Sequence, residues 1–171
     1  ICSPSSLDGL LTGVDVVYHT AAYISLRRDD WLVSRYINVH GTRNVVEACL
    51  RAGVGRFVHF SSIHALDHMA QSGTIDETCP LVEDHCPPYD RSKAAGERAV
   101  QKAIARGLDA VIIRPTAVIG PYDFRPSHLG QVLLALANGS MPALVTGGFD
   151  WVDARDVVRG ALRAAERAPT G

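Results

Sequence analysis

Residues 14–22 read Val-Asp-Val-Val-Tyr-His-Thr-Ala-Ala, and this stretch is the best single guide to the fold. Its first part is short and rich in β-branched residues, which is typical of a strand buried in a parallel sheet. The small residues Thr20, Ala21 and Ala22 follow and end the strand. We therefore expect a parallel sheet that contains this strand.

The segments that follow alternate between helical and strand patterns. Apolar residues at helical spacing predict a helix over residues 29–52, which Gly53 ends, and another over residues 89–106, which Gly107 ends. Short β-branched or aromatic runs predict strands at residues 56–60 and 109–113. This alternation predicts an α/β fold, a Rossmann-like parallel sheet with right-handed crossovers. The other expected elements are helices over residues 7–11, 129–138 and 154–167 and a strand near residues 143–145.

The composition excludes several classes of protein. The chain has 171 residues, 47% of them apolar, which is enough for about one domain with a real core. The formal charge of −1 gives no electrostatic basis for binding nucleic acid. No apolar run approaches the roughly 20 residues of a membrane-spanning helix, and we expect no membrane association. The four cysteines form no CxxC pair and no leader pattern opens the chain, so we expect a cytoplasmic protein.

The spacing Tyr89-x-x-x-Lys93 opens the second long helix. Residues four apart share a helix face, so the Lys93 ammonium can lie beside the Tyr89 phenol and lower its pKa. A phenol with a pKa brought down from about 10 could accept and donate protons near neutral pH. The spacing is short and common, and on its own it is more typical of a solvated helix face.

Small and polar residues follow three of the expected strands. They are His19-Thr20-Ala21-Ala22, Ser61-Ser62 and Arg114-Pro115-Thr116-Ala117-Val118. In an open α/β sheet, ligands bind beyond the carboxyl ends of the strands. A serine there can offer its hydroxyl to a substrate oxygen, and small residues let a flat cofactor lie close to the backbone. Tight packing is the competing explanation for the small residues.

Together these motifs resemble the extended short-chain dehydrogenases/reductases, in the NAD-dependent epimerase/dehydratase group. The resemblance spans residues 14–158, with the motifs in the family's order and at its intervals. The residues that carry it are Tyr18-His19-Thr20-Ala21-Ala22, Asn38-Val39-His40-Gly41-Thr42-Arg43-Asn44-Val45, Phe60-Ser61-Ser62, Tyr89-x-x-x-Lys93, Arg114-Pro115-Thr116-Ala117-Val118-Ile119-Gly120-Pro121 and Trp151-Val152-Asp153-x-x-Asp156-Val157.

The resemblance implies roles for individual residues and a cofactor, NAD or NADP. Tyr89 would be the general acid/base, Ser62 would orient the substrate oxygen, and Lys93 would lower the Tyr89 pKa and bind the nicotinamide ribose. Asn38 would brace the site from its helix, although a purely structural buried Asn is an equal alternative. The residues implied to line the cofactor, besides Tyr89 and Lys93, are Thr20, Ala21, Ala22, Pro115, Thr116, Val118 and Ser127.

The family's glycine-rich turn for the pyrophosphate has no counterpart among the fifteen glycines. The first βαβ unit and the residue that selects NAD or NADP are therefore expected to lie outside this chain. We interpret residues 1–171 as part of a longer protein: an incomplete Rossmann-like domain, with the start of the substrate-binding region at about residues 120–171. Alone, the chain is expected to bind a dinucleotide weakly or not at all and to show no turnover. Tight saturable binding in a titration with NADPH would contradict this.

Three reactions are possible within the family: carbonyl reduction, sugar-nucleotide epimerisation and sugar-nucleotide dehydration. Dehydratases carry an Asp-Glu pair after the catalytic hydroxyl, where this chain has Ile63-His64, so dehydration is disfavoured. Epimerases commonly carry an Arg before the aromatic-Val-x-Asp segment, and residues 147–153 contain none. Residues 120–127 look more like the dihydroflavonol-4-reductase-like branch. A carbonyl reductase or alcohol dehydrogenase is favoured, with a sugar-nucleotide epimerase as the alternative.

Other classes of function fit the sequence less well than an enzyme does. A non-catalytic cofactor sensor or scaffold is disfavoured because it has no need of Ser62, Tyr89 and Lys93 together. No Gly-x-Ser-x-Gly elbow supports a serine hydrolase. A metal site is disfavoured because Ala65 stands where a zincin needs Glu. The expected partners are a small molecule with a carbonyl or secondary alcohol and a second copy of the chain, bound through residues 29–52 and 89–106.

Overall fold

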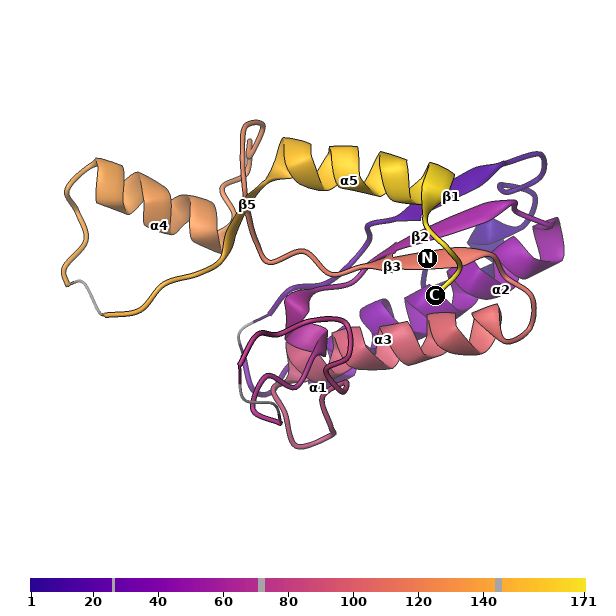
Figure 1. Ribbon diagram of the computed structural model, residues 1–171, viewed down its shortest axis with the longest axis horizontal. Coiled ribbons are helices and arrows are strands. Elements are labelled where there is room, and N and C mark those ends of the chain that lie inside the picture. Colours follow the sequence, from indigo (N-terminus) through magenta and orange to yellow (C-terminus); the bar gives the residue numbers. More distant parts are fainter. Residues whose placement is uncertain (26, 71–72, 144–145) are drawn as a thin grey trace.

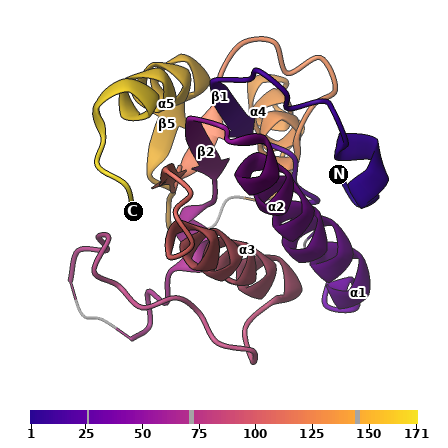
Figure 2. The same ribbon diagram turned by 90° about the vertical axis from the view of Figure 1, so that its right-hand side faces the viewer.

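The computed structural model describes residues 1–25, 27–70, 73–143 and 146–171 (Figure 1). Three parallel strands form the main sheet in the order β1-β2-β3. They are β1 (Val16–His19), β2 (Arg56–Phe60) and β3 (Ala110–Ile113). The central strand β2 buries Phe57 and Val58 completely, because helices cover both faces of the sheet (Figure 2).

Two helical columns cover one face of this sheet and a single helix covers the other (Figure 2). The first column is α1 (Trp31–Ser34), the π-helix η2 (Arg35–Gly41) and α2 (Thr42–Ala52). It ends at Gly53, whose left-handed backbone (φ 68°) suits a residue without a side chain. The second column is α3 (Pro88–Ile104), which begins with Pro88 at a position where no backbone N–H is needed. Helix α5 (Ala154–Arg167) lies across the opposite face.

The core lies between the sheet and the columns α2 and α3. It is formed by Val45, Val46, Cys49, Val54, Phe57, Val100, Ala103, Leu108 and Ala110. The two columns approach closely at Gly96 of α3, where an added Cβ would lie 3.2 Å from the carbonyl oxygen of Asn38. This contact brings the π-helix next to the first turns of α3.

A second, smaller unit extends away from the main sheet (Figure 1). Strands β4 (Ala117–Ile119) and β5 (Trp151–Asp153) pair in parallel, and α4 (His128–Ala137) projects beyond them. None of the residues of α4 is buried. Two short 3-10 turns complete the described elements, η1 (Pro4–Leu7) and η3 (Ile63–Ala65).

The expected α/β fold with a parallel sheet is confirmed, and several local expectations are wrong. The predicted helix over residues 7–11 is a 3-10 turn that ends at Leu7, followed by turns at Gly9 and Gly13 with positive φ. The predicted single helix over residues 29–52 contains a π-helical segment. The strand expected near residues 143–145 falls on Leu144 and Val145, outside the described residues, and β4 was not expected. Within the described residues, no helix has both the length and the apolar character to cross a bilayer.

Candidate active site

Polar residues meet at the carboxyl edge of the main sheet because the strand pairing continues past the strand ends. The N–H of Ser61 donates to the carbonyl of Ile113 (2.8 Å), and that of Ile63 donates to Pro115 (3.1 Å). These bonds fix Ser62, which lies between them, beside the chain that leaves β3. Ser62 is 8% exposed. Its backbone is extended, and its side chain accepts a hydrogen bond from the N–H of His64 (3.2 Å).

Tyr89, in the first turn of α3, directs its hydroxyl group toward Ser62. The two side chains are hydrogen-bonded, and this bond acts to lower the pKa of Tyr89. Burial acts more strongly in the opposite direction, and with a smaller effect from the nearby Asp90 the pKa of Tyr89 is raised above its ordinary value. The phenol is therefore fully protonated at neutral pH. The structure thus brings together two of the residues that the sequence proposed.

Lys93 lies one turn further along α3 and is 5% exposed. Its Nζ donates a hydrogen bond to the carbonyl of Phe60 at the end of β2 (2.7 Å). Burial lowers the pKa of Lys93 to about 8, and Glu97 opposes this shift. The net pKa of Tyr89 is raised, and the Lys93 ammonium bonds a backbone carbonyl. The expected lowering of the Tyr89 pKa by Lys93 therefore stays a prediction.

Asn38 lies in the π-helix and connects two other parts of the site. Its Oδ1 accepts from the N–H of Tyr23 (2.7 Å), and its Nδ2 donates to the carbonyl of Tyr23 (2.9 Å) and to Oγ of Ser92 (2.9 Å). Ser92 in turn donates to the carbonyl of Tyr89 (2.7 Å). The side chain of Asn38 therefore joins the loop after β1 to the turn that carries Tyr89. An i→i+5 helix is rare and frequently occurs at functional sites.

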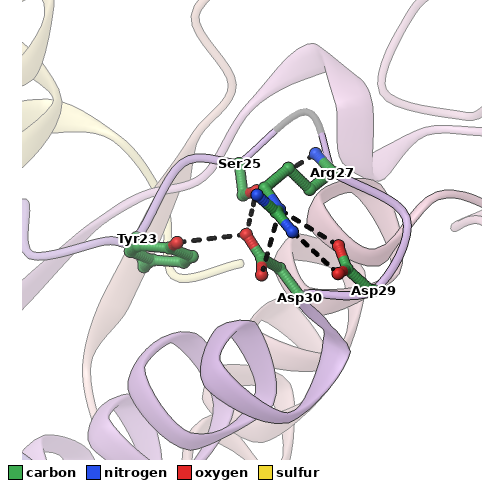
Figure 3. A network of polar contacts seen from close by, with 5 residues as sticks. All are labelled: Tyr23, Ser25, Arg27, Asp29 and Asp30. Atoms are coloured by element: carbon green, nitrogen blue, oxygen red, sulfur yellow. Dashed lines mark hydrogen bonds and ion pairs between the residues drawn. The ribbon is translucent and has the colours of Figure 1, made fainter.

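The loop after β1 is organised further by a polar network around Asp30 (Figure 3). The hydroxyls of Tyr23 (3.1 Å) and Ser25 (2.5 Å) both donate to Oδ2 of Asp30. Arg27 lies 3.8 Å from the other oxygen of Asp30 and pairs with Asp29. This network and the Asn38 bonds hold residues 20–25 over the carboxyl edge of the sheet.

A buried ion pair ties α3 to the end of β3. The side chain of Glu97 is fully buried and accepts three hydrogen bonds from Arg114. Nε donates to both carboxylate oxygens (3.0 and 3.2 Å), and Nη2 donates to Oε2 (2.7 Å). Neither residue was singled out as part of the site from the sequence. The available signal was helical spacing, since Tyr89, Lys93 and Glu97 recur every four residues on one face of α3.

The proposed cofactor-lining residues lie in two places. Thr20, Ala21 and Ala22 are exposed just beyond β1. Pro115 and Thr116 line a hollow of about 260 Å³ beside α5. The other two belong to the smaller unit: Val118 is in β4, 38% exposed, and Ser127 caps α4 by accepting from the N–H of Gly130 and donating to Asp123.

The residues at the carboxyl edge fit the nicotinamide half of a dinucleotide. The side chains just beyond β1 are small, so a ligand can approach the backbone there. The Lys93 ammonium donates one N–H to Phe60, and its other N–H groups can donate to a sugar hydroxyl. No metal site accompanies them: among the described residues, no group of three or more His, Cys, Asp or Glu side chains is arranged to hold an ion. In the part of the chain that the structure describes, no cysteine forms a disulfide.

A parallel sheet with a buried Lys and a Tyr–Ser hydroxyl pair at its carboxyl edge is typical of the Rossmann-like folds that bind dinucleotides. The match of the whole chain, residues 1–171, to the NAD dependent epimerase/dehydratase family specifies that class further. The chain belongs to this family, whose members depend on NAD.

The chain is similar to several curated proteins. It is 40% identical to sterol demethylase protein B of Methylococcus capsulatus over 97% of this chain and 51% of that protein. A dihydroflavonol 4-reductase-like protein of Synechocystis is 34% identical over 94% of this chain and 47% of its own length. Human sterol-4-alpha-carboxylate 3-dehydrogenase, decarboxylating, is 30% identical over 98% and 45%. The chain therefore spans about half the length of the curated relatives it matches.

A solved structure supports the same relationship. DesIV, a dTDP-glucose 4,6-dehydratase of Streptomyces venezuelae solved with NAD, superposes with a TM-score of 0.84 at 28% identity, over 99% of this chain and 54% of DesIV. The expected Rossmann-like fold and membership of the extended short-chain dehydrogenases/reductases are confirmed.

Proposed function

We propose that the full-length protein is an NAD(P)-dependent oxidoreductase that interconverts a carbonyl and a secondary alcohol through Ser62, Tyr89 and Lys93. One observation carries this proposal. The hydroxyls of Ser62 and Tyr89, which come from separate segments, are hydrogen-bonded to one another at the carboxyl edge of the sheet, where ligands of such folds bind.

The chemistry follows from the state of each group. Tyr89 keeps its proton at neutral pH because burial raises its pKa, so it is set to donate that proton to a carbonyl oxygen during reduction. Ser62, oriented by the N–H of His64, would hold the same oxygen. Lys93 would bind a ribose hydroxyl with the N–H groups that Phe60 does not use. NAD or NADP, when bound, supplies or accepts the hydride.

The same residues would run the oxidation in reverse. Tyr89 must then lose its proton to accept one from an alcohol. A positive charge on the oxidised nicotinamide would favour that loss, as would the Lys93 ammonium if a ligand turned it away from Phe60. Asn38 and Ser92 would act as positioning residues for the Tyr89 turn.

A hydrophobic alcohol or ketone of the sterol kind is the substrate class that we propose. Two of the relatives above carry sterol in their names. The smaller unit, which lies largely within the region we assign to substrate binding at residues 120–171, exposes large apolar side chains. Tyr122 is 79% exposed, Phe124 89% and Phe149 63%. A reductase is favoured over an epimerase because residues 147–153 offer no Arg to a nucleotide phosphate.

The direct test is Tyr89→Phe in the full-length protein. Loss of the proton donor is expected to lower kcat by about 10²–10⁴-fold, the usual range for general acid–base catalysis, with little change in KM. Tyr36→Phe is the matched control, since the Tyr36 side chain is half exposed on the π-helix and outside the site. Unchanged turnover by the Tyr89→Phe variant would remove the catalytic assignment.

We also propose a homodimer through the two long helical columns and a cytoplasmic location. The first column exposes Leu32 (75%), Val33 (43%) and Tyr36 (55%), which a second copy could cover. The cysteines of the described residues form no disulfide, which suits a reducing compartment. Light scattering of the Leu32→Asp variant tests the dimer, which is expected to dissociate.

A further inference from the structure

The buried ion pair between Glu97 and Arg114 has no part in the mechanism above. The Glu97 carboxylate is fully buried, and its three hydrogen bonds from Arg114 measure 2.7–3.2 Å. A buried pair often stabilises a fold no better than apolar residues of the same volume, because both charges must leave water. Its hydrogen bonds are directional, however, and they can fix two elements in one arrangement. Positioning is therefore a better account of this pair than stability.

Glu97 shares a face of α3 with two residues proposed for catalysis. Tyr89, Lys93 and Glu97 follow one another at intervals of four residues. Lys93, one turn before Glu97, is 5% exposed. The negative charge of Glu97 opposes the lowering of the Lys93 pKa by burial, and so favours the ammonium form. The carboxylate therefore bonds one cation directly and acts on a second through its charge.

Arg114 connects this carboxylate to the carboxyl edge of the sheet. It is the first residue after β3, and with Pro115 and Thr116 it lines the hollow of about 260 Å³ beside α5. The carbonyl of Pro115 accepts the hydrogen bond from the N–H of Ile63, the residue after Ser62. A shift of Arg114 would therefore move the wall of the hollow and the support of the Ser62 segment together.

We propose that Glu97 is a positioning residue for the nicotinamide end of the cofactor. Through Arg114 it holds residues 115–116 against the helix face that carries Lys93. This inference rests on the proposed function, in which Lys93 binds the nicotinamide ribose. The ADP half of the cofactor is expected to bind mainly through the glycine-rich turn that lies outside this chain. Glu97 should therefore affect the binding of one half of the dinucleotide and leave the other half unchanged.

The test is a calorimetric titration of the full-length protein with two ligands. One is the tighter-binding of NADH and NADPH, and the other is its matching fragment, ADP or 2′,5′-ADP, which lacks the nicotinamide and its ribose. In Glu97→Gln, an amide N–H faces the Arg114 donors and breaks the arrangement. Affinity for the dinucleotide should fall by about 10- to 100-fold, the equivalent of one lost charge-assisted hydrogen bond. Affinity for the fragment should stay within about twofold.

The matched control is Glu47→Gln, which breaks an exposed pair with Arg106 between α2 and the segment after α3. It should change neither affinity. Because Glu97→Gln also weakens the fold, Glu97→Leu/Arg114→Met separates positioning from stability. This double variant leaves no unpaired buried charge, but its apolar side chains offer no directional bonds. The selective loss of dinucleotide affinity should therefore remain in the double variant. If the loss disappears there, or if dinucleotide and fragment weaken equally, the pair is structural and the inference is overturned.

These titrations need no turnover, so they separate the inference from the proposed function. If Tyr89→Phe leaves turnover unchanged but the selective loss is observed, the catalytic assignment fails and the positioning role of Glu97 stands. If Tyr89→Phe abolishes turnover while Glu97→Gln binds both ligands as the wild type does, the proposed function stands and the positioning role is overturned. A wild-type protein that binds neither dinucleotide would overturn both.

Discussion

Helices α3 and α4 show that apolar sequence does not decide how firmly a helix is held. Helix α4 contains the apolar run Val132-Leu133-Leu134-Ala135-Leu136-Ala137, yet none of its residues is buried. Helix α3 is more polar, yet it buries Ser92, Lys93 and Glu97. Each of these three makes a hydrogen bond to another segment or to the Tyr89 turn. The difference lies in the contacts that the fold provides.

The two helices differ in the number of other segments to which their side chains are hydrogen-bonded. Helix α4 is held locally, through its cap at Ser127 and the Asp123 carboxylate. Helix α3 is bonded to the π-helix at Asn38, to β2 at Phe60 and to the end of β3 at Arg114. Buried polar bonds are costly to leave unmade, so they select one arrangement of the elements. A helix that is hydrogen-bonded to several other segments, as α3 is, can hold proposed catalytic side chains within hydrogen-bonding distance of their partners.

The largest expected change in unfolding free energy comes from breaking the buried ion pair between Glu97 of α3 and Arg114. Glu97→Gln keeps the shape but removes the charge, and it leaves the Arg114 guanidinium, whose side chain is 18% exposed, without its counter-ion. Breaking a buried pair in this way costs about 3–5 kcal/mol of unfolding free energy. Urea unfolding followed by circular dichroism measures it. Leu134→Ala on α4, 52% exposed, is the matched substitution and should cost under about 1 kcal/mol.

The double variant Glu97→Leu/Arg114→Met sharpens this prediction. With both charges removed, the double variant should be more stable than Glu97→Gln, because no unpaired charge is left in the interior. If the double variant is less stable than Glu97→Gln, the ion pair stabilises the fold by more than it costs to bury its two charges.

The second effect is a pH dependence that comes from Lys93. Its pKa is about 8 in the folded protein against an ordinary 10.5, so between these pH values the unfolded chain binds more protons. Stability is therefore expected to rise with pH across this window, by on the order of 3 kcal/mol in total. The destabilising contribution is fully present below pH 8 and is relieved as the pH approaches 10.5. The difference in unfolding free energy between the wild type and Lys93→Met should therefore change between pH 7 and 10, and a difference that is independent of pH would contradict the prediction.

How much of this could be predicted from the sequence differs between local and non-local features. The strand at residues 56–60 and the helix at residues 154–167 were predicted with the bounds that the structure has, because each carries its own periodicity and stop signals. The π-helix was not predicted, since its distinctive feature is the placing of Asn38 against Tyr23 and Ser92, which are distant in the sequence. Strand β4 follows Pro115 closely and has only three residues, so it gave no clear pattern.

The candidate site shows the same division. The sequence pointed to Tyr89, Ser62, Lys93 and Asn38, and the structure places them around one edge of the sheet; their roles stay proposals. It could not show which partner Lys93 would choose, because four-residue spacing gives proximity on a helix and the carbonyl of Phe60 comes from another segment. Burial, which reverses the expected direction of the Tyr89 pKa, is likewise a property of the whole fold.

A smaller effect is expected where the columns of the main unit touch. Gly96→Ala places a Cβ 3.2 Å from the carbonyl oxygen of Asn38, a backbone atom that cannot move without the π-helix. Overpacking of this kind costs about 1–3 kcal/mol. Gly160→Ala in α5 is the control, because a Cβ there meets nothing within 4 Å and alanine favours helix by about 1 kcal/mol. Opposite signs for the two changes in urea unfolding are expected, and equal signs would contradict the close contact.

The smallest effect is expected in the smaller unit, and it is the most direct test of the comparison between α3 and α4. Phe124 is 89% exposed, so Phe124→Ser removes almost no buried surface and should change the unfolding free energy of the 171-residue chain by less than about 0.5 kcal/mol. In the full-length protein the same change should be measured again, in stability and in KM. A loss of stability in the short chain would mean that the smaller unit packs more firmly than its exposure indicates. If the substitution raises KM in the full-length protein without lowering stability, Phe124 contacts the substrate. This is the result that the proposed function predicts for an exposed apolar side chain of the smaller unit.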